Sequence, residues 1–285
     1  MDKALQLLLF RGLVLVVGLV LIPFEATWAT ASTTDAPCQN PPFVDGEKIR
    51  YEIRYGFLRG GDITLEIVEG PTASKRQPWS IEGRAISSKL VSVFYRVDDT
   101  IRGWIEPREF VPSRLEMQVE ESGERGTRTV IYDHEEKVAH YRRNRTFHRK
   151  RGPSLLERQD DLVPQSQDAL SILYFLRCLA FEPGVEQRIP LHENGKNRVA
   201  RVTVGSPEEV ETTLGKRLGV PLEVHVTVEG KLANQRAIRV WLEPGPRRLP
   251  VRVEADLKFG KLQALLAGYR ESPKGRAEGE VAITR

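Results

Sequence analysis

The sequence predicts an all-β protein: one large antiparallel sheet, curled toward a partly open barrel or sandwich, with one amphipathic helix packed on it. Stretches of alternating apolar and polar residues recur along most of the chain, and short turn sequences separate them. Only about residues 168–180 show helical spacing of apolar residues. Many short strands interrupted once favour a curled sheet. We therefore expect a single β domain over residues 43–270, followed by a loose tail at 271–285.

Residues 1–31 have the features of an export signal. Basic residues precede the apolar run Leu13–Ile22, and Ala29–Ala31 supplies the small residues that signal peptidase requires. The apolar run is shorter than the roughly 20 residues that a membrane-spanning helix needs. We expect cleavage after Ala31, a periplasmic location and no transmembrane anchor after the signal is removed.

The two cysteines are predicted to form a disulfide. Residues 32–42 are rich in Pro, Ser and Thr and are expected to form an extended leader, which contains Cys38. Cys38 follows Pro37 and not a small residue, so we expect no lipid attachment. Cys178 is the only other cysteine, and an even pair in an exported protein is compatible with a bridge. Two unrelated thiols are the alternative; we favour the bridge, because the leader could lie across the helix.

Regular alternation predicts strands on both sides of the helix. Ile49, Tyr51, Ile53 and Tyr55 alternate with charged residues, as in a strand with one buried face, and the run from Val220 to Val228 repeats the pattern. Residues 144–167 are expected to be irregular. The predicted strands are Glu47–Phe57, Asp62–Glu69, Trp79–Ser87, Val91–Glu106, Arg114–Glu120, Thr127–Tyr132, Lys137–Arg143, Glu186–His192, Arg198–Val204, Val220–Val228, Ile238–Leu242, Val251–Phe259 and Leu262–Ala267.

The predicted helix has two different faces. Asp168 can accept a backbone N–H of the first turn, and Pro183-Gly184 is a stop signal. Steps of about 100° per residue gather an apolar face that must be buried: Ala169, Ile172, Leu173, Leu176, Leu179 and Ala180. The opposite stripe contains Asp168, Ser171, Tyr174 and Arg177. It is either a recognition patch or a hydrogen-bonded network that fixes the helix against a loop, and we favour the network, because buried Arg and Tyr side chains need partners.

Several motifs together resemble the DUF3108 family of exported bacterial envelope proteins. They are Pro42–Glu47 followed by Tyr51, Tyr55-Gly56 and Gly60-Gly61; Val97-Asp98-Asp99 running to Trp104; the helix with Asp168, Ser171, Tyr174 and Arg177; and Trp241 with Leu249-Pro250-Val251. The resemblance covers about residues 42–268. It implies an all-β envelope protein with a fold similar to that of the YmcC family, which is associated with capsule export, and it implies no activity. Cys178 departs from the family pattern, so the bridge would be a local feature.

A basic stretch interleaved with aromatic residues lies at the middle of the chain. Its cations are Arg142, Arg143, Arg145, Arg149, Lys150 and Arg151. Arginine forks suit phosphate and carboxylate groups, and export excludes nucleic acid as the partner. An anion-binding site is one interpretation. The other, which we favour, is a solvated strand end neutralised by nearby Glu157, Asp160 and Asp161.

No motif supports catalysis. The turn Asp133–Glu136 has metal-ligand residue types, but consecutive turn residues point in different directions, and we expect no metal, cofactor or catalytic residue. The sequence favours a noncatalytic envelope accessory protein that binds a lipid, glycolipid or anionic polysaccharide in the curved sheet, with an apolar trough and arginines at its rim. The alternatives are a structural module that binds another envelope protein, and an enzyme of unrecognised type acting on envelope polymer.

Overall fold

The computed structural model describes Cys38 and residues 40–70, 77–147, 152–228, 231–232, 238–257 and 260–271. The export signal and most of the leader and tail lie outside them. The elements are β1 (Lys48–Tyr55), β2 (Leu58–Glu69), β3 (Trp79–Ser87), α2 (Lys89–Ser92), β4 (Asp98–Ile105), β5 (Pro112–Glu121), β6 (Glu124–Asp133), β7 (Val138–Phe147), β8 (Ser154–Asp161), α3 (Ser171–Cys178), β9 (Glu186–Glu193), β10 (Lys196–Val204), β11 (Glu208–Thr212), β12 (Gly215–Val228), β13 (Lys231–Leu232), β14 (Ile238–Leu242), β15 (Pro250–Leu257) and β16 (Gly260–Arg270).

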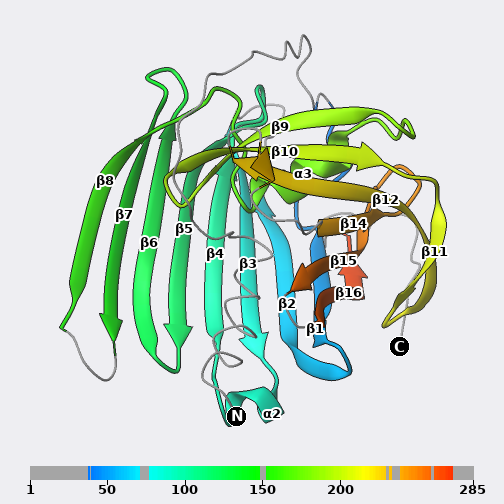
Figure 1. Ribbon diagram of the computed structural model, residues 1–285, viewed down its shortest axis with the longest axis horizontal. Coiled ribbons are helices and arrows are strands. Elements are labelled where there is room, and N and C mark those ends of the chain that lie inside the picture. The colour runs from blue at the N-terminus through cyan, green and yellow to red at the C-terminus, as the bar shows by residue number, and fades with distance from the viewer. Residues whose placement is uncertain are drawn as a thin grey trace.

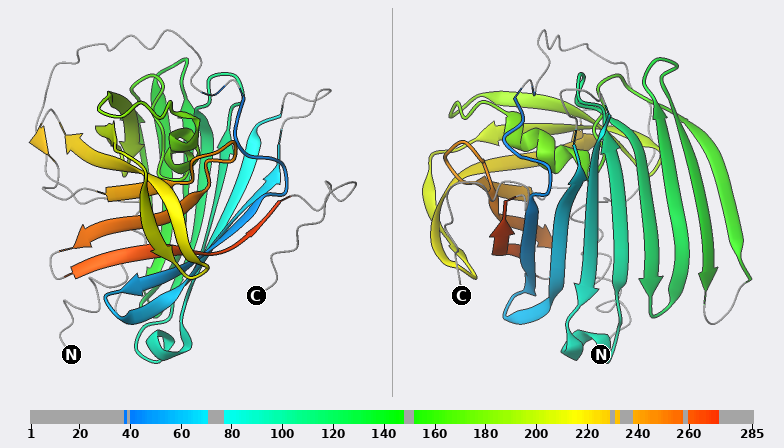
Figure 2. Two further views of the ribbon diagram at one scale, coloured as in Figure 1. Left: turned by 90° about the vertical axis from the view of Figure 1, so that its right-hand side faces the viewer. Right: turned by 180° about the vertical axis from the view of Figure 1, so that it is seen from behind.

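The strands of the described residues form one 16-stranded sheet in the order β8-β7-β6-β5-β4-β3-β2-β1-β16-β15-β14-β12-β10-β9, with β11 and β13 paired to β12. The chain runs outward from β1 to β8, passes through α3, enters again at β9 and returns to β16 beside β1. Figure 1 shows β2 to β8 as a tall wall, with β9, β10 and β12 lying across one end of it. The side view in Figure 2 shows the orange and red strands β14 to β16 crossing this wall at a steep angle. The predicted curled, all-β architecture is confirmed.

The segment between β8 and α3 joins the two outer parts of the sheet. The side chain of Asn197 on β10 donates to the carbonyl of Asp161 (2.7 Å) and accepts from the amide of Val163 (3.1 Å). A parallel bridge between Gln167 and Leu191 continues the contact. These bonds hold the end of β8 near the β9–β10 hairpin, so the sheet approaches closure at this point.

The predicted alternation agrees with the burial of the strands. Ile49, Tyr51 and Ile53 are buried on β1, and Leu222 and Val224 are buried on β12. The charged residues between such positions pair across neighbouring strands on the outer face, as Arg84 does with Asp98. Over the strands nearest β1 the inner face is thus mainly apolar, and the outer face carries ion pairs.

The helix is shorter than predicted. Its apolar face is buried as expected at Leu176 and Leu179, but its polar stripe is buried at least as deeply. The helix ends at Cys178, before Pro183-Gly184, because Leu179 is extended. Asp168 does stabilise the first turn, since its Oδ1 accepts the amides of Leu170 (2.9 Å) and Ser171 (2.7 Å). The polar stripe is the fully buried side: Ser171, Tyr174 and Arg177 are each at most 1% exposed, whereas Ile172 and Leu173 are only half-buried.

A buried ion pair explains why the polar side faces inward. Arg177 donates to both carboxylate oxygens of Glu47, at 2.6 and 2.9 Å, and the two residues are 0% and 1% exposed. The same guanidinium donates to the carbonyls of Pro42 (3.1 Å) and Arg247 (2.9 Å). One side chain therefore ties α3 to the segment entering β1 and to the loop between β14 and β15.

Aromatic rings and the disulfide surround this ion pair. The ring of Phe43 makes edge contacts with Trp79 and Tyr174, both at 5.2 Å between centroids, and the Arg177 guanidinium lies 5.0 Å from its centre. Cys38 is bonded to Cys178, which confirms the predicted bridge. The segment preceding β1 is thus fixed to α3 by a covalent bond, an ion pair and ring packing.

The strand predictions were wrong in three places. Residues 91–97 are not a strand, because Ser88 caps the short helix α2 by accepting the amide of Val91 (3.3 Å). Residues 144–167 are not irregular throughout: β7 continues to Phe147, and β8 follows with a charged, exposed sequence that shows no apolar alternation. The short strand β11 was also missed. Among the described residues, no helix has the length and hydrophobicity to cross a membrane.

We predict that removing one member of the buried pair is far more destabilising than removing both. Arg177→Met leaves the Glu47 charge buried without its partner, which should lower the free energy of unfolding by about 3–5 kcal/mol. The double variant Glu47→Met/Arg177→Met should recover much of that loss. Urea unfolding measures both.

The exposed pair Arg142–Glu157, with an N–O distance of 3.2 Å, is the control. Arg142→Met should cost no more than about 1 kcal/mol. A double variant in which the two core losses simply add would contradict this account of the pair.

Candidate functional site

A cavity of about 220 Å³ lies inside the curl of the sheet, next to α3. Its walls come from both halves of the sheet and from the less buried side of the helix. The apolar lining includes Ile63, Ile101 and Met117 from the first half, Val224, Val253 and Ala264 from the second, and Ile172 and Leu173 from α3. The apolar side of α3 therefore lines the cavity, and its polar side packs against the filled part of the core.

Small residues on β3 create part of this space. The inward positions of β3 become smaller along the strand, from Trp79 and Ile81 to Gly83 and Ala85, and the last two line the cavity. On the neighbouring strand β4, Gly103 leaves room for Leu170, whose side chain lies 2.9 Å from the position that a Cβ would take. Gly83 likewise makes room for Ile101 and Leu65, whose side chains lie 2.6 and 3.0 Å from the position of a Cβ, so both glycines let apolar neighbours pack close to the sheet at the cavity wall.

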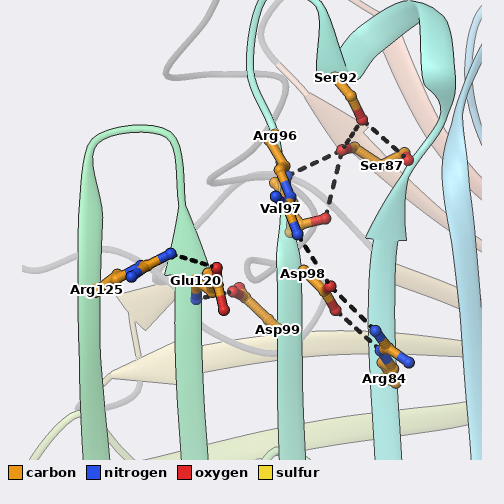
Figure 3. Close-up of polar contacts among 9 residues, drawn as sticks. All are labelled: Arg84, Ser87, Ser92, Arg96, Val97, Asp98, Asp99, Glu120 and Arg125. Atoms are coloured by element: carbon orange, nitrogen blue, oxygen red, sulfur yellow. Dashed lines mark hydrogen bonds and ion pairs between the residues drawn. The ribbon is translucent and has the colours of Figure 1, made fainter.

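Asp99 places a carboxyl group on the wall of this cavity. Figure 3 shows that consecutive aspartates of β4 have different partners: Asp98 binds Arg84 (2.9 and 3.0 Å), whereas Oδ1 of Asp99 accepts the amide of Glu120 (2.8 Å). Oδ2 of Asp99 has no hydrogen-bond partner within the described chain. Burial raises the pKa of Asp99 to about 6, while the Arg84 hydrogen bonds hold the pKa of Asp98 below its ordinary value.

His192 of β9 lines the same cavity from the opposite side. Its side chain is 3% exposed, its ring packs edge-on against Tyr132 at 5.8 Å, and its Nε2 atom has no hydrogen-bond partner in the described segments. Burial lowers the pKa of His192 to about 4, so the imidazole is neutral at physiological pH. His192 therefore adds a neutral imidazole to a wall that also includes the acidic residues Asp99, Asp168 and Glu193.

A smaller cavity of about 60 Å³ adjoins the first and leads to a pair of arginines. The two cavities share Met117, Asp168 and His192 among their lining residues, and Arg128 of β6 lines only the smaller one. Met117 pairs with Arg128 across β5 and β6, and Arg128 pairs with Arg143 across β6 and β7. Directly paired residues point to the same face of a sheet, so Arg128 and Arg143 both face the interior of the curl.

The predicted anion-binding residues do not form one surface. Arg143 and Arg145 face inward, whereas Arg142 lies on the outer face, where it is paired with Glu157. Alternation along β7 makes this separation unavoidable, so the single rim expected from the sequence is a wrong prediction. Arg149, Lys150 and Arg151 lie outside the described residues.

The polar residues of α3 are divided between the cavity and the core. Asp168 lines both cavities, and its backbone amide donates to the hydroxyl of Ser171 (2.8 Å). Tyr174 packs edge-on against Phe43, and Arg177 bonds to Glu47 and to two loop carbonyls. The bonds of Arg177 fix the helix against neighbouring loops, which is the interpretation that the sequence favoured over a recognition patch. The Asp133–Glu136 segment forms the turn between β6 and β7, in which Asp133 accepts the amide of Glu136 (2.8 Å). The described residues contain no group of His, Cys, Asp and Glu side chains placed to hold a metal ion.

Sequence comparison identifies the family of this chain. The model of the family "Protein of unknown function (DUF3108)" matches residues 50–267. The chain belongs to the DUF3108 family. The match includes every cavity-lining residue named above, and no curated protein matches the sequence.

One solved structure supports the fold of this DUF3108 chain, and a second gives a weaker alignment. A β-barrel-like protein of the domain of unknown function DUF1849, from Brucella abortus, aligns with a TM-score of 0.52 at 10% identity, covering 80% of this chain and 98% of that one. A protein from Parabacteroides distasonis, predicted to be a lipoprotein, aligns with a TM-score of 0.32 at 9% identity, covering 81% of this chain and 98% of its own. The first similarity agrees with a curled, barrel-like sheet.

Sequence analysis of this DUF3108 chain did not identify Arg128, His192 or the inward role of Asp99 as site residues. A signal was present for Arg128, because the alternation through Val130 and Tyr132 puts it on the apolar face of its strand. The shrinking side chains of β3 were a second signal. His192 had none, because its position depends on the β9–β10 hairpin meeting the opposite wall.

The raised pKa of Asp99 predicts a defined pH dependence of stability. Well below the ordinary Asp pKa of about 3.9 the carboxyl is protonated in both states, so Asp99→Asn should match the wild type. Between about pH 4 and pH 6 the unfolded chain releases this proton while the folded chain retains it, so the wild type loses stability over that window and the loss is complete above pH 6. The variant should therefore be more stable at pH 7.5, by on the order of 2 kcal/mol after allowance for solvent screening.

Asp98→Asn is the matched control, and its expected change in stability at pH 7.5 has the opposite sign. The pKa of Asp98 is lowered in the folded state, so this variant should be less stable than the wild type at pH 7.5 and should match it in acid. Denaturant unfolding from about pH 2 to pH 7.5 tests both, because the contribution of Asp98 is lost only below its ordinary pKa of about 3.9. If both variants shift in the same direction, the assigned environments are incorrect.

Proposed function

We propose that this protein is a noncatalytic accessory protein of the cell envelope that binds a single-chain amphipathic lipid in the cavity beside α3. The observation that carries the proposal is an apolar internal space whose one end leads to inward-facing arginines. An apolar pocket with a few convergent polar groups is the usual form of a small-molecule binding site. The apolar walls favour a hydrocarbon chain over a polysaccharide.

The size of the space supports one slender chain. Pockets for drug-sized ligands measure roughly 300–1,000 Å³, and the larger cavity is about 220 Å³. A bulky ring system or a pair of acyl chains would need more room. Among the ligands considered from the sequence, a lipid with one chain and an anionic head fits this volume best.

An exported location is part of the proposal. The disulfide Cys38–Cys178 supports an oxidising compartment, because such bridges are rare in the cytosol. With the signal features of residues 1–31, this favours a periplasmic protein that carries no lipid of its own. We predict that intact-mass measurement of protein recovered from the periplasm gives a chain beginning at Ser32, unacylated and oxidised. Recovery of residues 1–31, or of an acyl chain on Cys38, would contradict the proposal.

One observation favours a protein partner as a second candidate. Strand β8 pairs only with β7 along the described sheet, and its Leu155 is 58% exposed. A bare edge strand can pair with another chain. However, β8 carries charges at Glu157, Arg158, Asp160 and Asp161, which discourage edge-to-edge pairing. This edge therefore supports partner binding less strongly than the cavity supports lipid binding.

We predict that filling the cavity abolishes lipid binding without unfolding the protein. Ile101→Trp puts a large ring into the space and displaces an estimated three or four methylenes of the ligand. At about 0.8 kcal/mol for each, affinity for dodecanoate should fall roughly 100-fold in titration calorimetry. Ile131→Trp places the same ring on the outer face of β6, where Ile131 is 47% exposed, and should bind as the wild type does. Equal dodecanoate affinities for the wild type and both variants would contradict the assignment of the cavity as the binding site.

A further inference from the structure

We propose that Arg128 and Arg143 form a subsite for the anionic head, a carboxylate or a phosphate, of the lipid whose chain occupies the cavity. This inference rests on the proposed function and names the residues that would select the ligand class. Arg143 belongs to the basic stretch singled out in the sequence, and Arg128 is supplied by the neighbouring strand β6.

The pairing of two arginines directly across neighbouring strands calls for a counter-charge. Like charges at such positions are destabilising. Other arginines of this region have carboxylate partners: Arg142 is paired with Glu157 (3.2 Å), Arg145 with Glu124 (3.5 Å) and Arg158 with Asp160 (2.8 Å). Within the described residues, neither Arg128 nor Arg143 forms an ion pair, and the buried Nε of Arg143 has no hydrogen-bond partner.

Nearby carboxylates do not supply this counter-charge. Glu193 lies 3.2 Å from the guanidinium of Arg198, and burial raises the pKa of Asp168, which favours its neutral form. Asp99 is the remaining acid on the cavity wall, and its charge acts on Arg128 only through space. Even with Asp99 ionised, the arginine pair exceeds it by one positive charge, which an anionic group can balance.

The sheet register connects the arginines to the apolar cavity. Pairing partners across successive strands form a single inward row of Gly83, Ile101, Met117, Arg128 and Arg143. The first three line the larger cavity, and Arg128 lines the smaller one that adjoins it. A chain lying over Gly83 and Ile101 can therefore extend past Met117 and place its head beside Arg128.

The polar groups of the smaller cavity fit a charged head. Tyr132, Tyr141, His192 and Asn194 line it with Arg128. His192 is among these lining residues, and its Nε2 has no hydrogen-bond partner within the described chain. Guanidinium groups bind carboxylate and phosphate oxygens through paired, charge-assisted hydrogen bonds. The combination of an apolar space and two guanidinium groups selects an anionic amphiphile over a neutral one.

The test uses three probes with one chain length: dodecanoate, dodecyl phosphate and dodecanol. Titration calorimetry at low salt should show at least one anionic probe binding the wild type about tenfold or more tightly than dodecanol. Arg128→Gln and Arg143→Gln should each weaken that anionic probe about tenfold or more, as expected for loss of a charge-assisted hydrogen bond. Dodecanol binding should remain, which also shows that the variants are folded.

Arg142→Gln is the matched control, because Arg142 is the neighbour of Arg143 on the opposite face of β7. It should bind every probe as the wild type does. A loss for Arg142→Gln equal to that for Arg143→Gln would overturn the subsite and indicate general charge attraction. The tighter of the two anionic probes identifies carboxylate or phosphate as the preferred head.

The remaining outcomes separate this inference from the proposed function. Equal binding of all three probes, unchanged in both arginine variants, would overturn the subsite alone. Failure of every probe to bind the wild type would overturn both. Inorganic phosphate binding as tightly as dodecyl phosphate, and depending on the same arginines, would assign the site to a free anion and overturn its role as a head-group site.

Discussion

The buried pair between Arg177 and Glu47 is the interaction on which the arrangement of the molecule depends. Removing two charges from water costs several kcal/mol for each ion, and only near-complete hydrogen bonding offsets that cost. The guanidinium meets this condition with a bidentate carboxylate and two backbone carbonyls. Because the polar side of α3 is committed to the core, its apolar side must lie elsewhere, and it lies against the open interior of the sheet.

Much of the architecture could be predicted from the chain, because alternation is a local property. Positions such as Ile49 and Leu222 need only their neighbours in sequence to indicate a buried strand face. The helix faces could not be assigned in the same way. Whether Arg177 is solvated or buried depends on Glu47, which lies 130 residues away in the sequence. The edge strand β8 was missed because an exposed edge needs no apolar pattern.

Some features of the candidate site could be predicted from local sequence, and others could not. The change from Ile81 to the small residues Gly83 and Ala85, and the inward position of Arg128, are visible within single strands. The meeting of Asp99 with His192 across one cavity is not, because it requires the curl of the whole sheet. The cavity exists because side chains from distant segments do not fill the space between them, and no single stretch of sequence shows how those segments meet.

The pairing of β1 with β16 sets the order in which the chain can complete its structure. Lys48 lies opposite Arg270, so the first strand made must wait for the last before both of its edges are paired. Contacts of such long sequence separation form slowly. A nascent chain with only its first eight strands can form the outward meander and, once Cys178 is available, its disulfide, yet β1 still has an unpaired edge. That interval is when this protein is most prone to join other chains, so truncation before β16 should leave an aggregating fragment in place of a smaller stable domain.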